Sequence, residues 1–307
     1  MSRNRLFHTG NAVVAIVARV WELPERGSEV FAAGRGKVCA GGGFNSAAAA
    51  ARQRMEVLYA GAHGRGAFGD VVRAGMVAEG IEVWHQPVTS ADSGLSLVMV
   101  EPGGERTFVS VVGAETTWAT DQVSGFDLRR GDTVYVSGYS LLHPSSAGIL
   151  GDWVPTIEAG VRVVLDLCPL IGTAGAPVVD PVLGRADWIC AHLDEATELT
   201  EAADHAGAAS ALAGRARSGA VVRQGAAGCW VAERGGEAEL VPGFSVKAVD
   251  VTGAGDAHTG VFIAALASGM SPRQAARRAN AAAALTTTQP GPATCPSAAE
   301  LDAFLRG

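Results

Sequence analysis

Residues 249–260 read VDVTGAGDAHTG, and they join an expected strand at 244–249 to an expected helix at 257–268. The turn Gly253-Ala254-Gly255 leaves room for backbone N–H groups to converge where the helix begins. Unpaired N–H groups and the helix dipole both attract negative charge. This turn therefore predicts an anion-binding site.

Asp256 stands in the first turn of that helix, beside the expected anion. A carboxylate in this place suits a general base, which takes a proton from an attacking hydroxyl while the anion site holds a phosphoryl group in line. The alternative is that Asp256 only complements the helix dipole and the glycines only make a turn. A dinucleotide-binding fingerprint is disfavoured, because His258 occupies the position of its last small residue.

A second glycine cluster lies at residues 40–47, which read AGGGFNSA and lead into an alanine-rich expected helix at 45–54. Three consecutive glycines allow a ligand to lie directly against the backbone. Asn45 carries both donors and acceptors, which suits a ligand rich in hydroxyl groups. A flexible turn with Asn45 as the helix N-cap is the open alternative.

Short β-branched segments alternate with alanine-rich helical segments along most of the chain. Further strands are expected at 12–17, 57–60, 133–136, 161–165, 188–191, 220–223 and 229–232. Further helices are expected at 70–79, 145–159, 194–200, 206–218 and 272–286. Near-continuously apolar strands suit a parallel sheet that is covered on both faces. We therefore expect an α/β fold over 1–307, a single domain with a doubly wound, mostly parallel sheet flanked by helices.

Two stretches break this alternation, at about 18–39 and 84–112, and neither shows a helical period. Within the second, segments 95–101 and 106–111 flank Pro102-Gly103-Gly104, a pattern that predicts a hairpin. We expect the two stretches to pair as a small antiparallel β-sheet that forms a lid over a site. A surface excursion without a function is the alternative.

Charge and composition exclude several classes of protein. The chain has 24 basic and 31 acidic residues, a net charge of −7, which disfavours a nucleic-acid partner. Lys37 is followed by Val38, so neither lysine of the chain belongs to a Walker P-loop. Five scattered cysteines favour neither disulfides nor zinc. The short apolar run at 12–18 predicts a strand rather than a signal peptide, and no run is long enough for a transmembrane helix. We expect a soluble, cytoplasmic protein with no membrane partner.

Together, residues 40–47 and 250–260 resemble the two signatures of the ribokinase-like (PfkB) carbohydrate kinase family, G-G-x-x-N and D-T-x-G-A-G-D. Weaker similarities cover nearly the whole chain, at 64–69, 102–108, 194–195, 223–228 and 279–285. The resemblance implies a ribokinase-like fold and an ATP-dependent carbohydrate kinase that phosphorylates a hydroxymethyl group of a small sugar or sugar derivative. A nucleoside kinase of the same family stays open, as does a non-catalytic ligand-binding sensor on this fold.

The resemblance also implies roles for single residues. The catalytic set is the base Asp256 with the anion hole of Gly253, Ala254 and Gly255. The substrate-binding set is Gly41, Gly42, Asn45, Asn11 and Arg106. The ATP-binding set is Arg223, Gly225, Gly228 and Asn280, with Asn280 near the adenine. Glu195 would belong to a network around Mg²⁺, and a monovalent cation such as K⁺ would lie near Asp250, Thr252 and Gly291. The expected partners are a small-molecule substrate and, through the lid strands, a second copy in a homodimer.

The chain departs from the family pattern at several positions. Ala15 aligns with a family aspartate that holds substrate hydroxyls, and His192 and His258 replace the family's Asn and Phe. The family's G-D-D-x-F-G is GRGAFG at 64–69, which introduces Arg65. An arginine there would suit a substrate with a carboxylate or a phosphate, whereas the alternative is a solvated surface arginine. The sequence therefore leaves open whether the substrate is a sugar, a sugar acid or a nucleoside.

Overall fold

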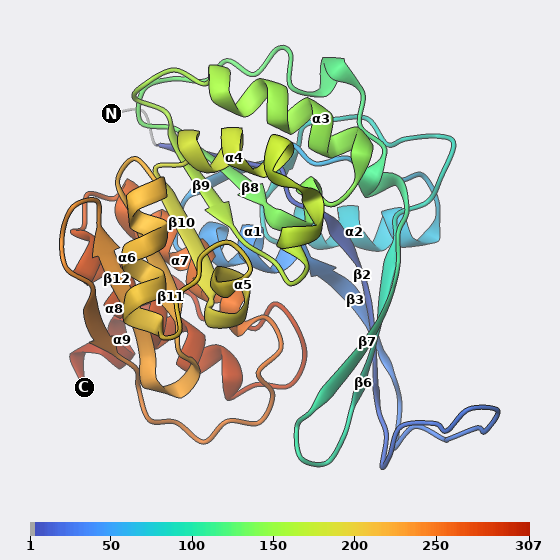
Figure 1. Cartoon of the computed structure of the whole chain (residues 1–307). Helices are drawn as coiled ribbons and strands as arrows, with labels where there is room; N and C mark the ends of the chain where they lie inside the picture. The colour runs from blue at the N-terminus through green and yellow to red at the C-terminus, as the bar shows by residue number, and fades with distance from the viewer. Residues whose placement is uncertain (1–3) are drawn as a thin grey trace.

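The computed structural model describes residues 4–307 and contains two β-sheets, with helices packed around the larger one (Figure 1). Residues 1–3 of the expected domain lie outside the described residues. The larger sheet has nine strands in the order β13-β12-β11-β10-β9-β8-β1-β4-β5. The bounds are β1 (Arg5–His8), β4 (Glu56–Tyr59), β5 (Glu82–Val83), β8 (Thr133–Ser137), β9 (Arg162–Asp166), β10 (Trp188–His192), β11 (Gly219–Arg223), β12 (Gly228–Glu233) and β13 (Glu239–Pro242). From β5 to β11 neighbouring strands are parallel, and β12 and β13 add an antiparallel edge.

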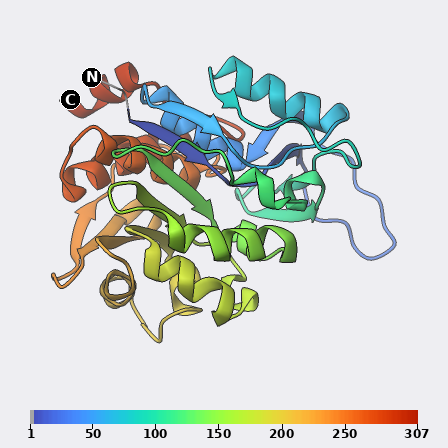
Figure 2. The same cartoon turned by 90° about the horizontal axis from the view of Figure 1, so that it is seen from above.

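Helices cover both faces of this sheet (Figures 1 and 2). One core holds residues of α1, α2, α7, α8 and α9, and the other holds residues of α3, α4 and α6. The helix bounds are α1 (Gly43–Arg52), α2 (Ala67–Ala78), α3 (Pro144–Trp153), α4 (Ala176–Arg185), α5 (Leu193–Thr197), α6 (His205–Arg215), α7 (Ala254–Ala267), α8 (Pro272–Thr287) and α9 (Ala298–Arg306). Successive residues of a strand enter opposite cores, as Leu6 and Phe7 of β1 do. This arrangement confirms the expected doubly wound α/β fold.

The smaller sheet has the order β3-β2-β6-β7 and stands beside the main body (Figure 1). Its strands are β2 (Ala12–Arg19), β3 (Lys37–Gly42), β6 (Leu95–Val100) and β7 (Arg106–Val111). The predicted hairpin is confirmed, since β6 and β7 pair antiparallel around residues 101–105. The expectation of a wholly antiparallel sheet was wrong, because the two central strands, β2 and β6, are parallel. They come from distant segments and need no tight turn between them.

The expected strand at 12–17 is present as part of β2 in the smaller sheet, whereas the first strand of the larger sheet is β1. The strand predicted just before the glycine motif was wrong. The sequence before the glycine motif is extended at Glu239–Pro242, where it pairs with β12. The expected strand at 244–249 is a loop, because no further strand edge lies beside it and Phe244 instead packs on Phe304.

Two helices were not expected from the sequence. Helix α4 contains Pro177 in its first turn and Pro181 in its interior. Proline is disfavoured inside helices, but α4 is held by burial of Val179, Val182 and Leu183 in the second core. Helix α9 is short, and a capping box of Ser297 and Glu300 begins it.

The two helices that follow the glycine clusters pack directly on each other. Nearly every residue of α1 from Phe44 to Ala50 is buried, and α7 is buried from Ala257 to Leu266. At their contact, a Cβ added to Gly260 would lie 2.4 Å from the Ser46 carbonyl oxygen and 2.8 Å from the Ala49 Cβ. A glycine and a row of alanines therefore set the separation of the two helices, and with it the separation of their first turns.

We predict that Gly260→Ala lowers the free energy of unfolding by about 1–3 kcal/mol, because the added methyl group has no space between α7 and α1. Urea denaturation followed by circular dichroism measures this change. Gly148→Ala in α3 is the matched control, since nothing lies within 4 Å of its added Cβ. That exposed helix position should gain up to about 1 kcal/mol from the better helix former. Equal stabilities of the two variants would contradict the assigned packing.

Candidate active site

The predicted site residues come together at the carboxyl edge of the larger sheet. Strands β9, β10 and β11 end there at Asp166, His192 and Arg223. Helices α1 and α7 begin near the same place, since Asn45 of α1 contacts Asp256 of α7. In open α/β sheets this edge is where ligands bind.

Asp256 lies in the first turn of α7, whose N-cap Gly253 has φ 75°, a left-handed conformation that favours glycine. The Asn45 side-chain amide donates a 2.8 Å hydrogen bond from Nδ2 to Asp256 Oδ2. Burial raises the pKa of Asp256 to about 6, and the Asn45 hydrogen bond opposes that rise. The negative charges of Asp166 and Glu195 raise the pKa further, whereas Arg223 lowers it. This carboxylate is thus ionised at neutral pH and still basic enough to accept a proton.

Backbone N–H groups gather beside this carboxylate. Within residues 4–307, the N–H groups of Gly253, Gly255 and Asp256 donate no hydrogen bond, whereas Ala254 donates to the Val251 carbonyl at 3.3 Å. Of the residues predicted to form the anion hole, Gly253, Gly255 and Asp256 therefore have free N–H groups, whereas the Ala254 N–H is bonded within the turn. A Cβ on Gly255 would lie 3.7 Å from Arg223 Nε, so a guanidinium adjoins the free N–H groups. Both features favour an anion.

Arg223 is held in place by two carboxylates. Its Nη1 lies 2.8 Å from Asp166 Oδ1 and also donates to the Thr259 hydroxyl at 2.9 Å, while Nη2 lies 3.3 Å from Glu195 Oε2. Burial raises the pKa of both carboxyl groups, and the Arg223 charge opposes this rise. Sequence reasoning missed Asp166. The available signal was its position, because an acid that ends an apolar strand such as β9 points toward the ligand edge of the sheet.

These carboxylates retain atoms that could face a metal ion. Asp166 Oδ2 and Glu195 Oε1 accept no hydrogen bond from residues 4–307, and neither oxygen is fully buried. Mg²⁺ commonly takes one or two carboxylates and completes its shell with phosphates and water. The two residues therefore fit Mg²⁺ that arrives with a nucleotide. No group of three or more His, Cys, Asp or Glu side chains within the described residues could hold a metal alone.

A cavity of about 620 Å³ adjoins the anion-binding turn. Its lining includes all the residues predicted to bind the nucleotide, namely Arg223, Gly225, Gly228 and Asn280. Asn280 is buried, and its Nδ2 donates to the Val241 carbonyl at 2.9 Å and the Pro242 carbonyl at 3.2 Å. Its Oδ1 faces His258 Nε2 at 3.2 Å. Asn280 thus braces the cavity wall with all its polar atoms, rather than leaving them for a ligand.

His258 supports the same wall from α7. Because Asn280 Oδ1 can only accept a hydrogen bond, His258 Nε2 carries the proton. Burial lowers the pKa of His258 to about 3, so the ring is neutral at physiological pH. The histidine in this family position is therefore part of a neutral cavity wall.

The predicted substrate-side residues lie where the smaller sheet joins the body. Gly41 and Gly42 end β3, and the Gly43 N–H donates to the Asn11 carbonyl at 2.8 Å. The side chain of Asn11 accepts a 2.9 Å hydrogen bond from the Ser140 hydroxyl. A Cβ on Gly41 would lie 3.0 Å from the Ala15 Cβ, so Ala15 lies on the same face as Gly41. On this face, position 15 presents a methyl group beside Gly41.

Arg65 is exposed, and its side chain makes no hydrogen bond or ion pair with the described residues. The segment around Arg65 leads into α2, and the Asp92 carboxylate accepts the N–H groups of Phe68 and Gly69 at the start of that helix, at 3.0 and 2.7 Å. The structure favours the solvated interpretation of Arg65.

The three residues predicted for a monovalent cation lie together. Asp250 accepts hydrogen bonds from the Thr252 N–H and hydroxyl at 2.9 and 2.6 Å and from the Gly291 N–H at 2.8 Å, which helps to lower its pKa against the effect of burial. Arg106 of β7 donates to the Thr252 hydroxyl at 3.2 Å. Lys37 Nζ lies 2.9 Å from the place of a Cβ on Gly291. The Asp250 carboxylate therefore accepts three hydrogen bonds and lies beside two cationic side chains.

Comparisons with known proteins agree with this geometry. The family model for pfkB family carbohydrate kinases matches residues 8–299. An uncharacterised sugar kinase of Escherichia coli K12 is 27% identical over 304 residues, which cover 98% of this chain and 94% of that protein. The crystal structure of adenosine kinase from Sinorhizobium meliloti superposes with a TM-score of 0.86 at 22% identity, over the whole of both chains. Ribokinase from Arabidopsis thaliana, in a complex with ribose and ATP, superposes over both whole chains with a TM-score of 0.80 at 22% identity.

No helix within residues 4–307 is both long enough and apolar enough to cross a membrane.

We predict that Asn45→Leu raises the pKa of Asp256 above its value of about 6, because the substitution keeps the buried volume but removes the hydrogen bond to the carboxylate. Carboxyl ¹³C NMR titration measures this pKa, with Asp256→Asn identifying the signal. Ser46→Ala is the control, since Ser46 bonds His8 and the Gly43 carbonyl rather than Asp256. An unchanged Asp256 pKa in Asn45→Leu would show that the hydrogen bond does not act on this group.

Proposed function

Because the chain belongs to the pfkB family of carbohydrate kinases, we propose that it transfers the γ-phosphoryl group of ATP to a hydroxymethyl group of a small sugar or sugar derivative. The observation that carries this proposal is the placement of Asp256, a carboxylate beside free N–H groups and Arg223 at a helix start. A protein that only binds ligands has no need for a base next to an anion site.

Asp256 acts as the general base. Its carboxylate accepts the proton of the substrate hydroxyl, the hydroxyl oxygen bonds to the γ-phosphorus, and the bond from phosphorus to the β,γ-bridging oxygen breaks to leave ADP. The pKa of about 6 supports this role, since the group is ionised at pH 7. Asn45 orients the carboxylate through its 2.8 Å hydrogen bond.

The anion hole stabilises the phosphoryl group during transfer. The N–H groups of Gly253, Gly255 and Asp256 are assigned to its oxygens, and Ala254 holds the turn. Such donors stabilise charge most effectively where they are fixed before the reaction. Arg223, held between Asp166 and Glu195, adds a positive charge beside Gly255.

The nucleotide is assigned to the cavity of about 620 Å³. Gly225 and Gly228 have φ of 57° and 109°, so their loop lacks side chains where the phosphates would approach. Mg²⁺ bound with ATP would neutralise phosphate charge, and Asp166 and Glu195 are the residues placed to hold it. The neutral wall of His258 and Asn280 is assigned to the adenine side.

The substrate is assigned to the space between Asp256 and the inner face of the smaller sheet. Asn45, Gly41, Gly42 and Asn11 are assigned to this space, together with Arg106 of β7, which donates to the Thr252 hydroxyl. We propose that this sheet is a lid that closes over the substrate and excludes water from the phosphoryl group.

We also propose that two copies pair through the outer face of this lid. Val38, Ile16, Leu97 and Val109 lie in one row across the four strands. Val38 and Val109 are each more than half exposed, at 57% and 51%. An apolar row with half-buried Ile16 and Leu97 at its centre and exposed valines at its ends, on a sheet with open edges, suits a self-complementary interface.

Asp256→Asn should leave the fold and ADP binding intact while kcat falls by about 10³-fold or more, because the amide cannot accept the hydroxyl proton. An assay of ADP release measures kcat, and titration calorimetry with ADP measures ADP binding. In the unmodified protein, kcat should fall as the pH drops through about 6, where Asp256 becomes protonated. Asp194→Asn, an exposed acid near the site, is the control. Undiminished turnover of Asp256→Asn would exclude the proposed base.

A substrate panel should show ADP release with at least one hydroxymethyl compound among neutral sugars, sugar acids, sugar phosphates and nucleosides. We run the panel with K⁺ and with a large organic cation in its place. K⁺ binding at the Asp250 cluster stays a prediction, and equal rates with both cations would contradict it. A ligand that raises the melting temperature without any turnover would support the sensor instead of the kinase.

A further inference from the structure

The loop at 288–297, which joins α8 to α9, lies directly behind the anion-binding turn. The Gly291 N–H donates to Asp250 Oδ2 at 2.8 Å. The Ala293 nitrogen lies 3.6 Å from the place of a Cβ on Gly253. A displacement of this loop would therefore move both Asp250 and the turn that presents the free N–H groups.

The backbone conformation of the loop at 288–297 is not stabilised by the intrinsic preferences of its residues alone. Ala293 has φ 54°, a left-handed conformation that costs a residue with a Cβ about 1–2 kcal/mol. The Thr294 hydroxyl donates to the Thr286 carbonyl at 3.0 Å, which ties one point of the loop to α8. Contacts from outside the loop are needed to keep the strained residue in place.

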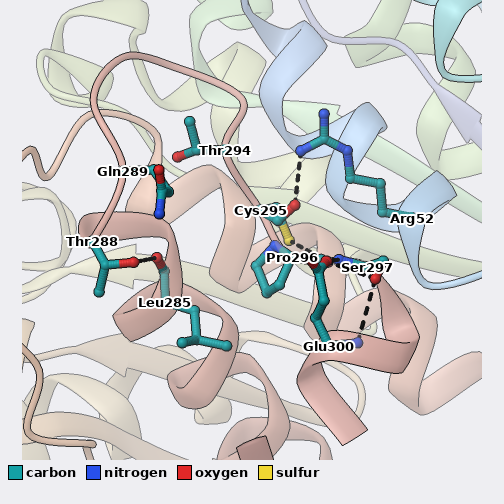
Figure 3. A pocket seen from close by; sticks show the side chains of 9 residues that line it. All are labelled: Arg52, Leu285, Thr288, Gln289, Thr294, Cys295, Pro296, Ser297 and Glu300. Atoms are coloured by element: carbon teal, nitrogen blue, oxygen red, sulfur yellow. Dashed lines mark hydrogen bonds between the residues drawn. The ribbon is translucent and has the colours of Figure 1, made fainter. Parts of the chain in front are cut away.

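Arg52 supplies such contacts from the end of α1. Its Nη1 donates to the carbonyl oxygens of Ala293 and Cys295, both at 2.7 Å. Figure 3 shows the guanidinium facing the Cys295 carbonyl across the loop. A single side chain thus bridges the carbonyls on either side of Thr294.

Glu79 fixes the orientation of that guanidinium. Its two carboxylate oxygens accept hydrogen bonds from Arg52 Nε at 2.9 Å and Nη2 at 2.5 Å. Such a planar, two-point pair leaves the third nitrogen, Nη1, directed at the loop. The hydrogen bond and charge of Glu79 raise the pKa of Arg52, so it stays charged.

We propose that Arg52 is a positioning residue for phosphoryl transfer, which acts on the anion hole through the backbone of residues 291–295. The proposal rests on the proposed function, since it concerns the same anion hole. Arg52 touches no residue assigned to ATP or to the substrate. It therefore acts on the rate of transfer rather than on the binding of either ligand.

Arg52 also lines a cavity of about 440 Å³, together with Thr288, Gln289, Thr294, Cys295 and Glu300 (Figure 3). Removal of its side chain would open that cavity toward the Ala293 and Cys295 carbonyls. A small guanidinium compound could then reach the vacated position and donate to the same oxygens.

The test is Arg52→Ala, assayed with and without methylguanidine at millimolar concentration. We expect kcat to fall about 10- to 100-fold, less than the ~10²–10³-fold cost of removing an oxyanion donor outright, because the hole is displaced rather than deleted. KM for ATP should change less than about threefold. Methylguanidine should restore at least about a third of the lost kcat in this variant, and it should leave the unmodified enzyme unchanged. A wild-type kcat in Arg52→Ala, or a loss of kcat that methylguanidine does not restore, would overturn the proposal.

Arg215→Ala is the matched control, because Arg215 also joins one carboxylate, that of Asp180, to a backbone carbonyl, that of Leu199. Arg215 lies at the end of α6. We expect Arg215→Ala and Arg52→Ala to lower the melting temperature by similar amounts, but we expect no change in kcat for Arg215→Ala. A drop in kcat equal to that of Arg52→Ala would overturn the proposal as well.

Arg52→Lys covers the case in which Arg52→Ala does not fold. Its ammonium keeps a charge beside Glu79 but cannot reach both loop carbonyls in the same plane. We expect kcat to fall at least about fivefold, and full activity would overturn the proposal. Asp256→Asn in the same assay tests the proposed function separately. The activity of that variant tests Asp256 as the general base, whereas the Arg52 variants test whether Arg52 positions the anion hole.

Discussion

The contact between α1 and α7 is the constraint on which the site depends. Gly260 allows the Ser46 carbonyl to approach within a distance that any side chain would prevent. That approach brings the first turns of both helices together and places Asn45 against Asp256. Each glycine cluster would still form its own turn without this contact, but the amide and the carboxylate would then belong to separate surfaces. Packing between two helix interiors therefore sets the geometry of a polar pair at their ends.

The charges of the candidate site are balanced by one arginine among three carboxyl groups. Asp166, Glu195 and Asp256 lie near one another with Arg223 among them, and burial raises the pKa of all three carboxyl groups. Without the guanidinium, three partly buried carboxylates would repel one another. Arg223 therefore makes the cluster compatible with ionised carboxylates, and it stands where phosphate charge would enter. The Arg223 side chain thus stabilises the carboxylate cluster and also favours an anion beside it.

The sequence was sufficient for the general fold and for the centre of the site, because both depend on local patterns. The apolar strands and the glycine clusters predict a doubly wound sheet with an anion-binding turn, and α7 begins at that turn. The errors came from tertiary pairing. Residues 12–17 form a good strand in isolation, but only their partners place them in the smaller sheet. Pro181 disfavours a helix at α4, so this helix could not be predicted from propensity; burial of its apolar side chains stabilises it.

Site residues that act across large sequence distances were the hardest to find. Asp166 belongs to no glycine motif, and its place beside Arg223 follows from the pairing of β9 with β10 and of β10 with β11. Arg52 lies 241 residues from Ala293 along the chain, and nothing local connects it with the loop. In contrast, Gly253, Gly255 and Asp256 are neighbours, so their joint chemistry can be inferred from order alone.

The neutral wall beside α7 has a consequence for the proton balance of ligand binding. The pKa of His258 is lowered to about 3, as is that of His8, and that of His63 to about 4. These buried rings therefore exchange no protons near neutrality, whereas Asp256, beside the cavity, has a pKa of about 6. An anion that enters next to it raises its pKa further. The Asp256 carboxyl group thereby couples nucleotide binding to proton uptake.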